Sequence, residues 1–131
     1  MRRLWVRRTI EAPAAAAWRV LTDVTAWPSW GPSVRAASIT RPELGLGATG
    51  RVETVVGPSL PFEITEFEPG RRWAWRVAGL AATDHVVTAI GDDRREVAFG
   101  VPWFAGPYLA VCRVALARID ALARAETVIE R

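Results

Sequence analysis

Apolar and polar positions alternate along most of this 131-residue chain, and helical spacing replaces the alternation near both ends. An apolar stripe behind Pro13 predicts a helix over 13–23, and a second, kinked helical turn over 27–30 follows it. From residue 106 or 107 the period of 3.6 returns, which predicts a long closing helix. The alternating segments, each predicted to form a strand, are residues 4–10, 33–40, 49–56, 60–68, 73–78, 82–90 and 97–101.

The connections between the later strands are short, which favours an antiparallel sheet. Glycine and proline mark most of the turns, and Gly91 with the two aspartates behind it indicates a hairpin. Phe67 departs from the parity of its strand, which predicts a bulge near Glu66. One strand, two short helices, six strands and a long helix predict a single α+β domain over residues 1–131. In it, a sheet of about seven strands curves around the last helix.

The closing helix has an apolar side and a charged side. Asp120 and Arg124 are four residues apart on the charged side, so they are expected to form an ion pair. The apolar side consists of Leu109, Cys112, Leu116, Ile119 and Ala123, and the opposite side carries Arg113, Asp120 and Arg124.

Several positions, taken in order, are similar to a known family. They are Pro13, Trp18, Leu21, Asp23 and Trp30 near the N-terminus, then Gly50, the EFEPG segment at 66–70, and His85. The chain resembles the SRPBCC proteins, the START-related helix-grip superfamily that includes the polyketide cyclase/dehydrase-like proteins. One departure is Ala12, which precedes the first helix where Ser, Thr or Asp would cap it best. The resemblance implies an apolar cavity between sheet and long helix, open near the second short helix and the hairpin loops.

Composition and charge narrow the range of functions. Half of the residues are hydrophobic, no segment has the length of a membrane span, and no signal peptide is recognisable, so a cytoplasmic location is expected. The net charge of +3 comes with arginine but no lysine. Most arginines have acidic neighbours, and only Arg2, Arg3, Arg7 and Arg8 cluster, as a solvated strand face would require. We therefore expect no nucleic-acid partner, and either a monomer or a homodimer.

Metal and cofactor chemistry are not expected either. Cys112 is the only cysteine and His85 the only histidine, which leaves too few ligands for zinc and excludes an internal disulfide. No phosphate-binding or dinucleotide motif and no nucleophile elbow occur, so the sequence predicts no cofactor and no conventional nucleophile.

Aromatic residues recur at one parity of several strands, which makes them candidates to line a cavity. Trp73 and Trp75 project to the same face of their strand, where they either fill the core or contact a ligand. Trp27 and Trp30 either form a lid or attach the second helix to the sheet, and Trp103 either shapes an entrance or anchors the last helix. The predicted ligand contacts are Trp27, Trp30, Phe62, Trp73, Trp75, Arg76, Phe99 and Trp103.

His85 is the first candidate for acid–base chemistry. Asp84 precedes it, but neighbours on a strand point to opposite faces, so only one of the two faces a cavity. A two-residue hairpin at 92–93 would send Asp84 inward, whereas a three-residue turn at 79–81 would pair Trp75 with His85 and send His85 inward. A bulge in this strand would reconcile the two inferences, and the family resemblance favours His85.

Tyr108, the sole tyrosine, opens the last helix and completes the catalytic candidates His85, Asp84 and Tyr108. Glu53 and Glu63 are further carboxylates, which an exposed face of the sheet explains.

Two functions follow from these expectations. The first is binding of a hydrophobic or aromatic small molecule, such as a polyketide or a lipid, in the cavity. The alternative, which the resemblance implies, is a polyketide cyclase/dehydratase-type enzyme. In it, His85, Asp84, Tyr108 and Arg76 would move protons during aldol closure and loss of water.

Overall fold

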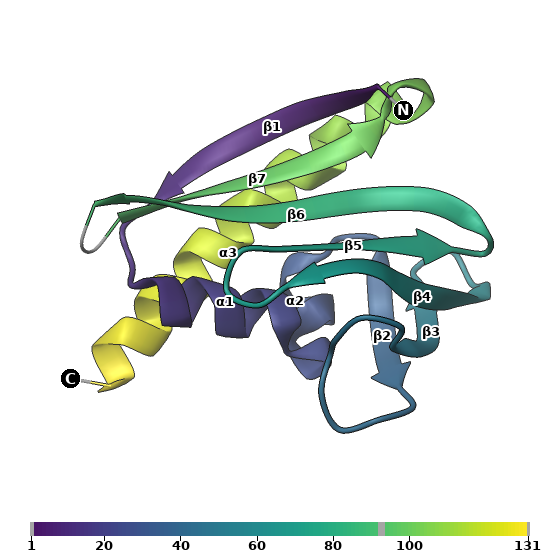
Figure 1. The fold of residues 1–131 in the computed structure, drawn as a ribbon, viewed down its shortest axis with the longest axis horizontal. Helices are drawn as coiled ribbons and strands as arrows, with labels where there is room; N and C mark the ends of the chain where they lie inside the picture. The colour runs from purple at the N-terminus through teal and green to yellow at the C-terminus, as the bar shows by residue number, and fades with distance from the viewer. Residues whose placement is uncertain (1, 92–93, 131) are drawn as a thin grey trace.

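A computed structural model describes residues 2–91 and 94–130 as a curved sheet with its helices on one face (Figure 1). The predicted strands and helices are present in the predicted order, which confirms the α+β, helix-grip-like fold class. The elements are β1 (Arg3–Ile10), α1 (Ala14–Thr22), the 3₁₀ turn η1 (Val24–Ala26), α2 (Trp27–Trp30), β2 (Val34–Ile39), β3 (Thr49–Thr54), β4 (Ser59–Glu68), β5 (Arg72–Val77), β6 (Leu80–Gly91), β7 (Arg94–Pro102), the 3₁₀ segment η2 (Trp103–Tyr108) and α3 (Leu109–Glu130).

The sheet is antiparallel throughout, with the strand order β1-β7-β6-β5-β4-β3-β2. The first strand therefore pairs with the last, and the two short helices cross from one edge of the sheet to the other. Figure 1 shows α3 running along the concave side, where it contacts β1, β7, α1 and α2. No helix in the part of the chain that the structure describes is long and apolar enough to span a membrane.

The apolar side of α3 forms the centre of the core, as predicted: Cys112, Leu116, Ile119 and Ala123 are all buried. Asp120, predicted on the charged side of this helix, is nevertheless buried, because its carboxylate lies between two arginines. Arg124 Nε donates to it at 2.8 Å, which confirms the predicted pair one turn apart, and Arg8 Nε of β1 donates at 2.9 Å. The basic face of the first strand thus helps to attach α3 to the sheet.

The two short helices are joined through their tryptophans. Trp27 and Trp30 are buried, and their indole N–H groups donate to the carbonyl oxygens of Leu21 at 3.0 Å and Val20 at 2.9 Å in α1. These contacts favour attachment of the helix over a movable lid. The sequence predicts Pro13 as the first residue of the helix. In the structure it is the N-cap, with an extended ψ of 153°, and α1 begins at the next residue.

Bulges in the sheet settle the register of β6. The bulge predicted near Glu66 is present between Ile64 and Glu66. The turn between β5 and β6 has two residues, 78 and 79, with φ angles of 52° and 79°, so the predicted three-residue turn is wrong. Next to this turn, β6 has one extra residue between Ala81 and Asp84, opposite Trp75, and at its other end Ile90 is a second extra residue. The bulge expected in that strand is thus confirmed.

The bulges change the predicted pairs but keep one of the two predicted parities. His85 pairs with Trp73, two residues from the predicted Trp75, and also with Phe99, so its side chain faces α3. Thr88 pairs with Glu96, because Ile90 shifts the register that a plain hairpin would give. The hairpin residues 92–93 lie outside the described residues.

Gly50 is the glycine of the predicted motifs whose lack of a side chain permits a close approach. A Cβ there would lie 2.0 Å from the Ser38 carbonyl oxygen and 2.7 Å from the Phe62 ring. Only glycine lets β2 and the Phe62 ring approach this closely.

Candidate functional site

Two adjoining cavities lie between the hairpin ends of the sheet and the beginning of α3. The outer cavity has a volume of about 340 Å³ and the inner one about 40 Å³. The two cavities meet at a shared set of residues, Ser33, Val34, Trp75, Thr83 and Tyr108. The rest of the outer lining is apolar except for Thr54 and includes Val52, Leu60, Val77, Val101 and Ala105.

Aromatic rings enclose the inner cavity. Trp27, Trp73 and His85 form a stack, with ring centroids 5.3 Å apart in the first pair and 3.7 Å in the second. Phe99 meets the His85 ring edge-on at 4.7 Å, and Trp75 meets Trp73 edge-on at 5.5 Å. The predicted aromatic set therefore both fills the core and lines a cavity, and this packing explains why the inner cavity is small.

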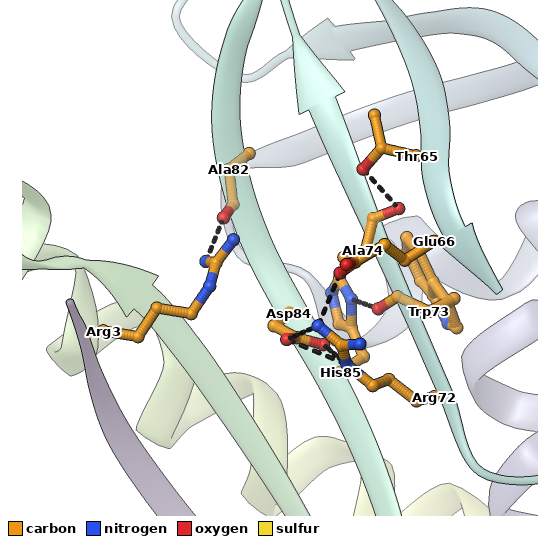
Figure 2. Close-up of polar contacts among 9 residues, drawn as sticks. All are labelled: Arg3, Thr65, Glu66, Arg72, Trp73, Ala74, Ala82, Asp84 and His85. Atoms are coloured by element: carbon orange, nitrogen blue, oxygen red, sulfur yellow. Dashed lines mark hydrogen bonds and ion pairs between the residues drawn. The ribbon is translucent and has the colours of Figure 1, made fainter. Parts of the chain in front are cut away.

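His85 is held in one orientation by the sheet. It is 2% exposed, and its Nδ1 lies 3.1 Å from the carbonyl oxygen of Trp73 on β5 (Figure 2). Burial lowers the pKa of His85 to about 4, although the contact with the Trp73 carbonyl and the nearby Asp84 charge oppose this shift. The imidazole is therefore neutral at neutral pH, which makes it a weak base there.

Asp84 lies on the opposite face of β6 and lines neither cavity. It is 1% exposed and accepts hydrogen bonds from Arg72, at 3.0 Å from Nε and 2.6 Å from Nη2 (Figure 2). Arg72 also pairs with Glu66, and these contacts, above all the hydrogen bond with Asp84, raise the pKa of Arg72. The structure thus does not bring Asp84 to His85 for joint chemistry.

We expect the replacement Asp84→Asn to lower the free energy of unfolding by about 2 kcal/mol, because it takes the negative partner from a buried, charge-assisted hydrogen bond. Glu66→Gln is the matched control, since it changes the same guanidinium's other partner, whose side chain is 51% exposed. Its cost should be about 0.5 kcal/mol or less. Urea denaturation of both variants measures the difference, and equal losses would contradict the role given to Asp84.

Tyr108 and Ser33 lie next to each other at the junction of the two cavities. The Tyr108 hydroxyl lies 2.6 Å from Ser33 Oγ, and burial raises the pKa of Tyr108 while this hydrogen bond opposes the shift. On the other side of the junction, Trp75 Nε1 donates to Thr83 Oγ1 at 2.8 Å. These four side chains supply the polar groups at the junction, while the remaining lining of both cavities is apolar except for His85 and Thr54.

Three further predicted residues differ in their placement. Phe62 is buried against Trp27, behind the cavities. Arg76 points away from them and pairs with Glu63 at 3.6 Å. Trp103 is 62% exposed and lines neither cavity, so the structure does not bring it or Arg76 to the site.

Sequence reasoning missed Ser33 and Thr83. Thr83 is two residues before His85, so the parity of the strand signals that both face α3. No comparable signal exists for Ser33, whose role depends on contact with Tyr108, far along the chain. Cys112 also lines the inner cavity, and burial raises its pKa to about 11, which makes the thiol a poor nucleophile.

No group of three or more His, Cys, Asp or Glu side chains that could hold a metal ion occurs among residues 2–91 and 94–130. The cavity linings offer aromatic rings, hydroxyls and one neutral imidazole. Such a set suits an apolar ligand with few polar groups.

A protein-family model described as "Polyketide cyclase / dehydrase and lipid transport" matches residues 1–125. No curated protein matches the sequence. Among solved structures, the fold is similar to BexL, a di-domain ARO/CYC from the BE-7585A biosynthetic pathway, with a TM-score of 0.74 and 15% identity. The match covers 95% of this chain and 47% of BexL, so the chain spans about half the length of that protein.

Two further structures have the same fold at low sequence identity. DynU16, from the dynemicin biosynthetic locus, matches with a TM-score of 0.67 and 18% identity over 95% of this chain and 48% of its own. NE0264 from Nitrosomonas europaea matches with a TM-score of 0.67 and 17% identity over 96% of both chains. The fold therefore occurs both alone and as half of a longer chain.

Proposed function

Because this chain belongs to the polyketide cyclase/dehydrase and lipid transport family, we propose that it binds a hydrophobic or aromatic small molecule in the two adjoining cavities. The observation that carries the proposal is the outer cavity of about 340 Å³. It is apolar except for Thr54, whose hydroxyl donates to the Pro58 carbonyl oxygen, and the polar groups where it meets the inner cavity. Small-molecule sites are of this kind, with an apolar lining and a few placed polar groups, and they begin at about this volume.

The size and position of the cavity define the class of ligand. A volume of about 340 Å³ suits a molecule of one to three rings or a short acyl chain. The lining residues come from β2 to β7 on one side and from η2 on the other, so a ligand would contact both parts of the fold.

Blocking the outer cavity tests this proposal. We expect Val77→Trp, which places an indole in the cavity, to abolish binding of naphthalene-type and fatty-acid probes, measured by calorimetry and by the shift in melting temperature. Arg76→Trp adds the same side chain one residue earlier, on the outer face of β5, and should leave binding unchanged. Failure of the wild-type protein to bind any probe, or equal binding by both variants, would overturn the proposal.

A cyclase/dehydratase-type enzyme is the second candidate, and it is favoured by one observation: His85 and Tyr108 line the same inner cavity. Ring closure of a poly-β-ketone needs a base for the carbon-bound proton and a donor for the carbonyl oxygen that becomes a hydroxyl. A neutral imidazole with a pKa of about 4 and a tyrosine already paired with Ser33 are weak agents for these steps. Binding is therefore the better-supported function, and cyclisation lost in His85→Phe would reverse this order.

A further inference from the structure

The His85 imidazole presents an unsatisfied hydrogen-bond acceptor to the inner cavity. A carbonyl oxygen can only accept a hydrogen bond, so the Nδ1 atom at 3.1 Å from the Trp73 carbonyl must carry the proton. The ring is neutral at neutral pH, because burial lowers its pKa to about 4. Nε2 then carries a lone pair and no proton.

No residue in the described part of the chain donates to Nε2. The hydroxyls of Tyr108 and Ser33 pair with each other, and the Trp75 indole donates to Thr83. The Trp73 indole N–H, on a residue that lines the same cavity, is buried without a partner, but it does not donate to Nε2. Cys112 lines the same cavity but forms no hydrogen bond with His85 in the described structure. Since polar groups inside a protein are rarely left without partners, an acceptor on a residue that lines a cavity is a place where a ligand can supply the donor.

We propose that the ligand carries a hydroxyl group on a planar ring, and that this hydroxyl donates a hydrogen bond to Nε2 of His85. The inference rests on the proposed function and names the ligand class for the same site, a phenol or an enol. His85 is then the residue that determines specificity, because its Nε2 accepts a hydrogen bond only from a ligand group that can donate one.

The dimensions of the two cavities support this arrangement. About 40 Å³ holds a hydroxyl or a few water molecules but no aromatic ring, whereas the outer cavity of about 340 Å³ has room for one. Because the cavities meet at Trp75, a ring in the outer cavity contacts an indole while its hydroxyl extends toward His85.

The same geometry disfavours other polar groups. An ether or ketone oxygen can accept a hydrogen bond from a free donor of the lining, such as the Trp73 indole N–H, but it leaves Nε2 without a donor. A hydroxyl donates to Nε2 and can accept a hydrogen bond at the same time. A carboxylate would add a buried negative charge, and neither cavity has an arginine in its described lining to pair with it. A hydroxyl is the simplest neutral substituent of a ring that can donate a hydrogen bond to Nε2.

Affinities of the full chain for 2-naphthol and 2-methoxynaphthalene, measured by calorimetry, test the proposal. The ratio of the two affinities should fall by about tenfold from wild type to His85→Phe, the equivalent of one hydrogen bond. Phenylalanine keeps a flat ring beside Trp73, so the apolar contacts remain. Thr88→Val, outside both cavities on the same strand, is the control and should leave the ratio unchanged. An unchanged ratio in His85→Phe would overturn the inference.

A second measurement needs no variant. Because the chain has one histidine, its ¹⁵N spectrum contains a single pair of imidazole signals. The Nε2 signal should move on addition of 2-naphthol and stay in place with 2-methoxynaphthalene, while the Nδ1 signal stays in both. Binding of 2-naphthol without movement of Nε2 overturns the hydroxyl inference alone, whereas no binding of either compound overturns the proposed function and this inference together.

Discussion

Replacement of Trp73 by alanine is expected to lower the free energy of unfolding by about 3–5 kcal/mol, the range for deleting a large buried aromatic side chain. Trp73 is 0% exposed and lies between two rings, with Trp27 on one side and His85 on the other. Its removal therefore costs transfer free energy and leaves a void between α2 and the sheet. A domain of this size has a total stability of about 5–15 kcal/mol, so the variant should be marginally folded or unfolded at 37 °C.

Trp103→Ala is the matched control for this prediction. Trp103 keeps 62% of its surface exposed and contacts only Phe104 among the aromatic residues of the described chain. Its removal should change the free energy of unfolding by about 0.5 kcal/mol or less. Guanidinium denaturation followed by circular dichroism measures both variants. A loss below 1 kcal/mol for Trp73→Ala would show that the ring stack contributes little to stability.

Most of the fold could be predicted because it depends on local patterns. Alternation within each segment identifies a strand, and a period of 3.6 identifies a helix, without any knowledge of neighbours in space. The bulge near Glu66 was also visible, because Phe67 breaks the parity of its own strand. The burial of Asp120 could not be predicted, since it depends on Arg8 from a strand more than a hundred residues away.

The candidate site could be predicted only where the alternation of side chains along a strand decides which face a residue is on. Phe62, Trp73 and Phe99 group together because alternation places them on one face. The choice between Asp84 and His85 depended on two extra residues of β6, Ile90 and one between Ala81 and Asp84, and no residue type there marks a bulge. The sequence could therefore state the conflict and suggest a bulge, while only the register of β6 decides it.

The size of the cavity could not be predicted from the sequence, for a different reason. The same tryptophans are consistent with a wide cavity or a filled core, because volume depends on how rings stack rather than on their number. In the structure Trp27 stacks on Trp73, and this contact occupies the space beside α3. The remaining space is displaced toward the hairpins, where Val77 and Ala105 line the outer cavity.

The stability of the protein should fall by about 3 kcal/mol as the pH is lowered through the range from 6.5 to 4, because of His85 alone. The pKa of this histidine is 6.5 in the unfolded chain and about 4 in the folded one, mainly because of burial. Between these values the unfolded state binds a proton that the native state does not, so acid favours unfolding. Above 6.5 both states are neutral at this position, and its contribution is fully present.

His85→Phe separates this effect from the titration of the carboxylates, which occurs at lower pH for unperturbed groups. Urea denaturation of both proteins at several pH values between 7 and 5 gives the slope of stability against pH. The wild-type slope should exceed that of His85→Phe and approach the value for one proton, about 1.4 kcal/mol per pH unit, near the lower end of that range. Equal slopes would mean that the imidazole gains a proton in the native state as readily as in the unfolded one. Nε2 would then be a donor at mildly acidic pH, and the cavity would select acceptors in place of hydroxyls.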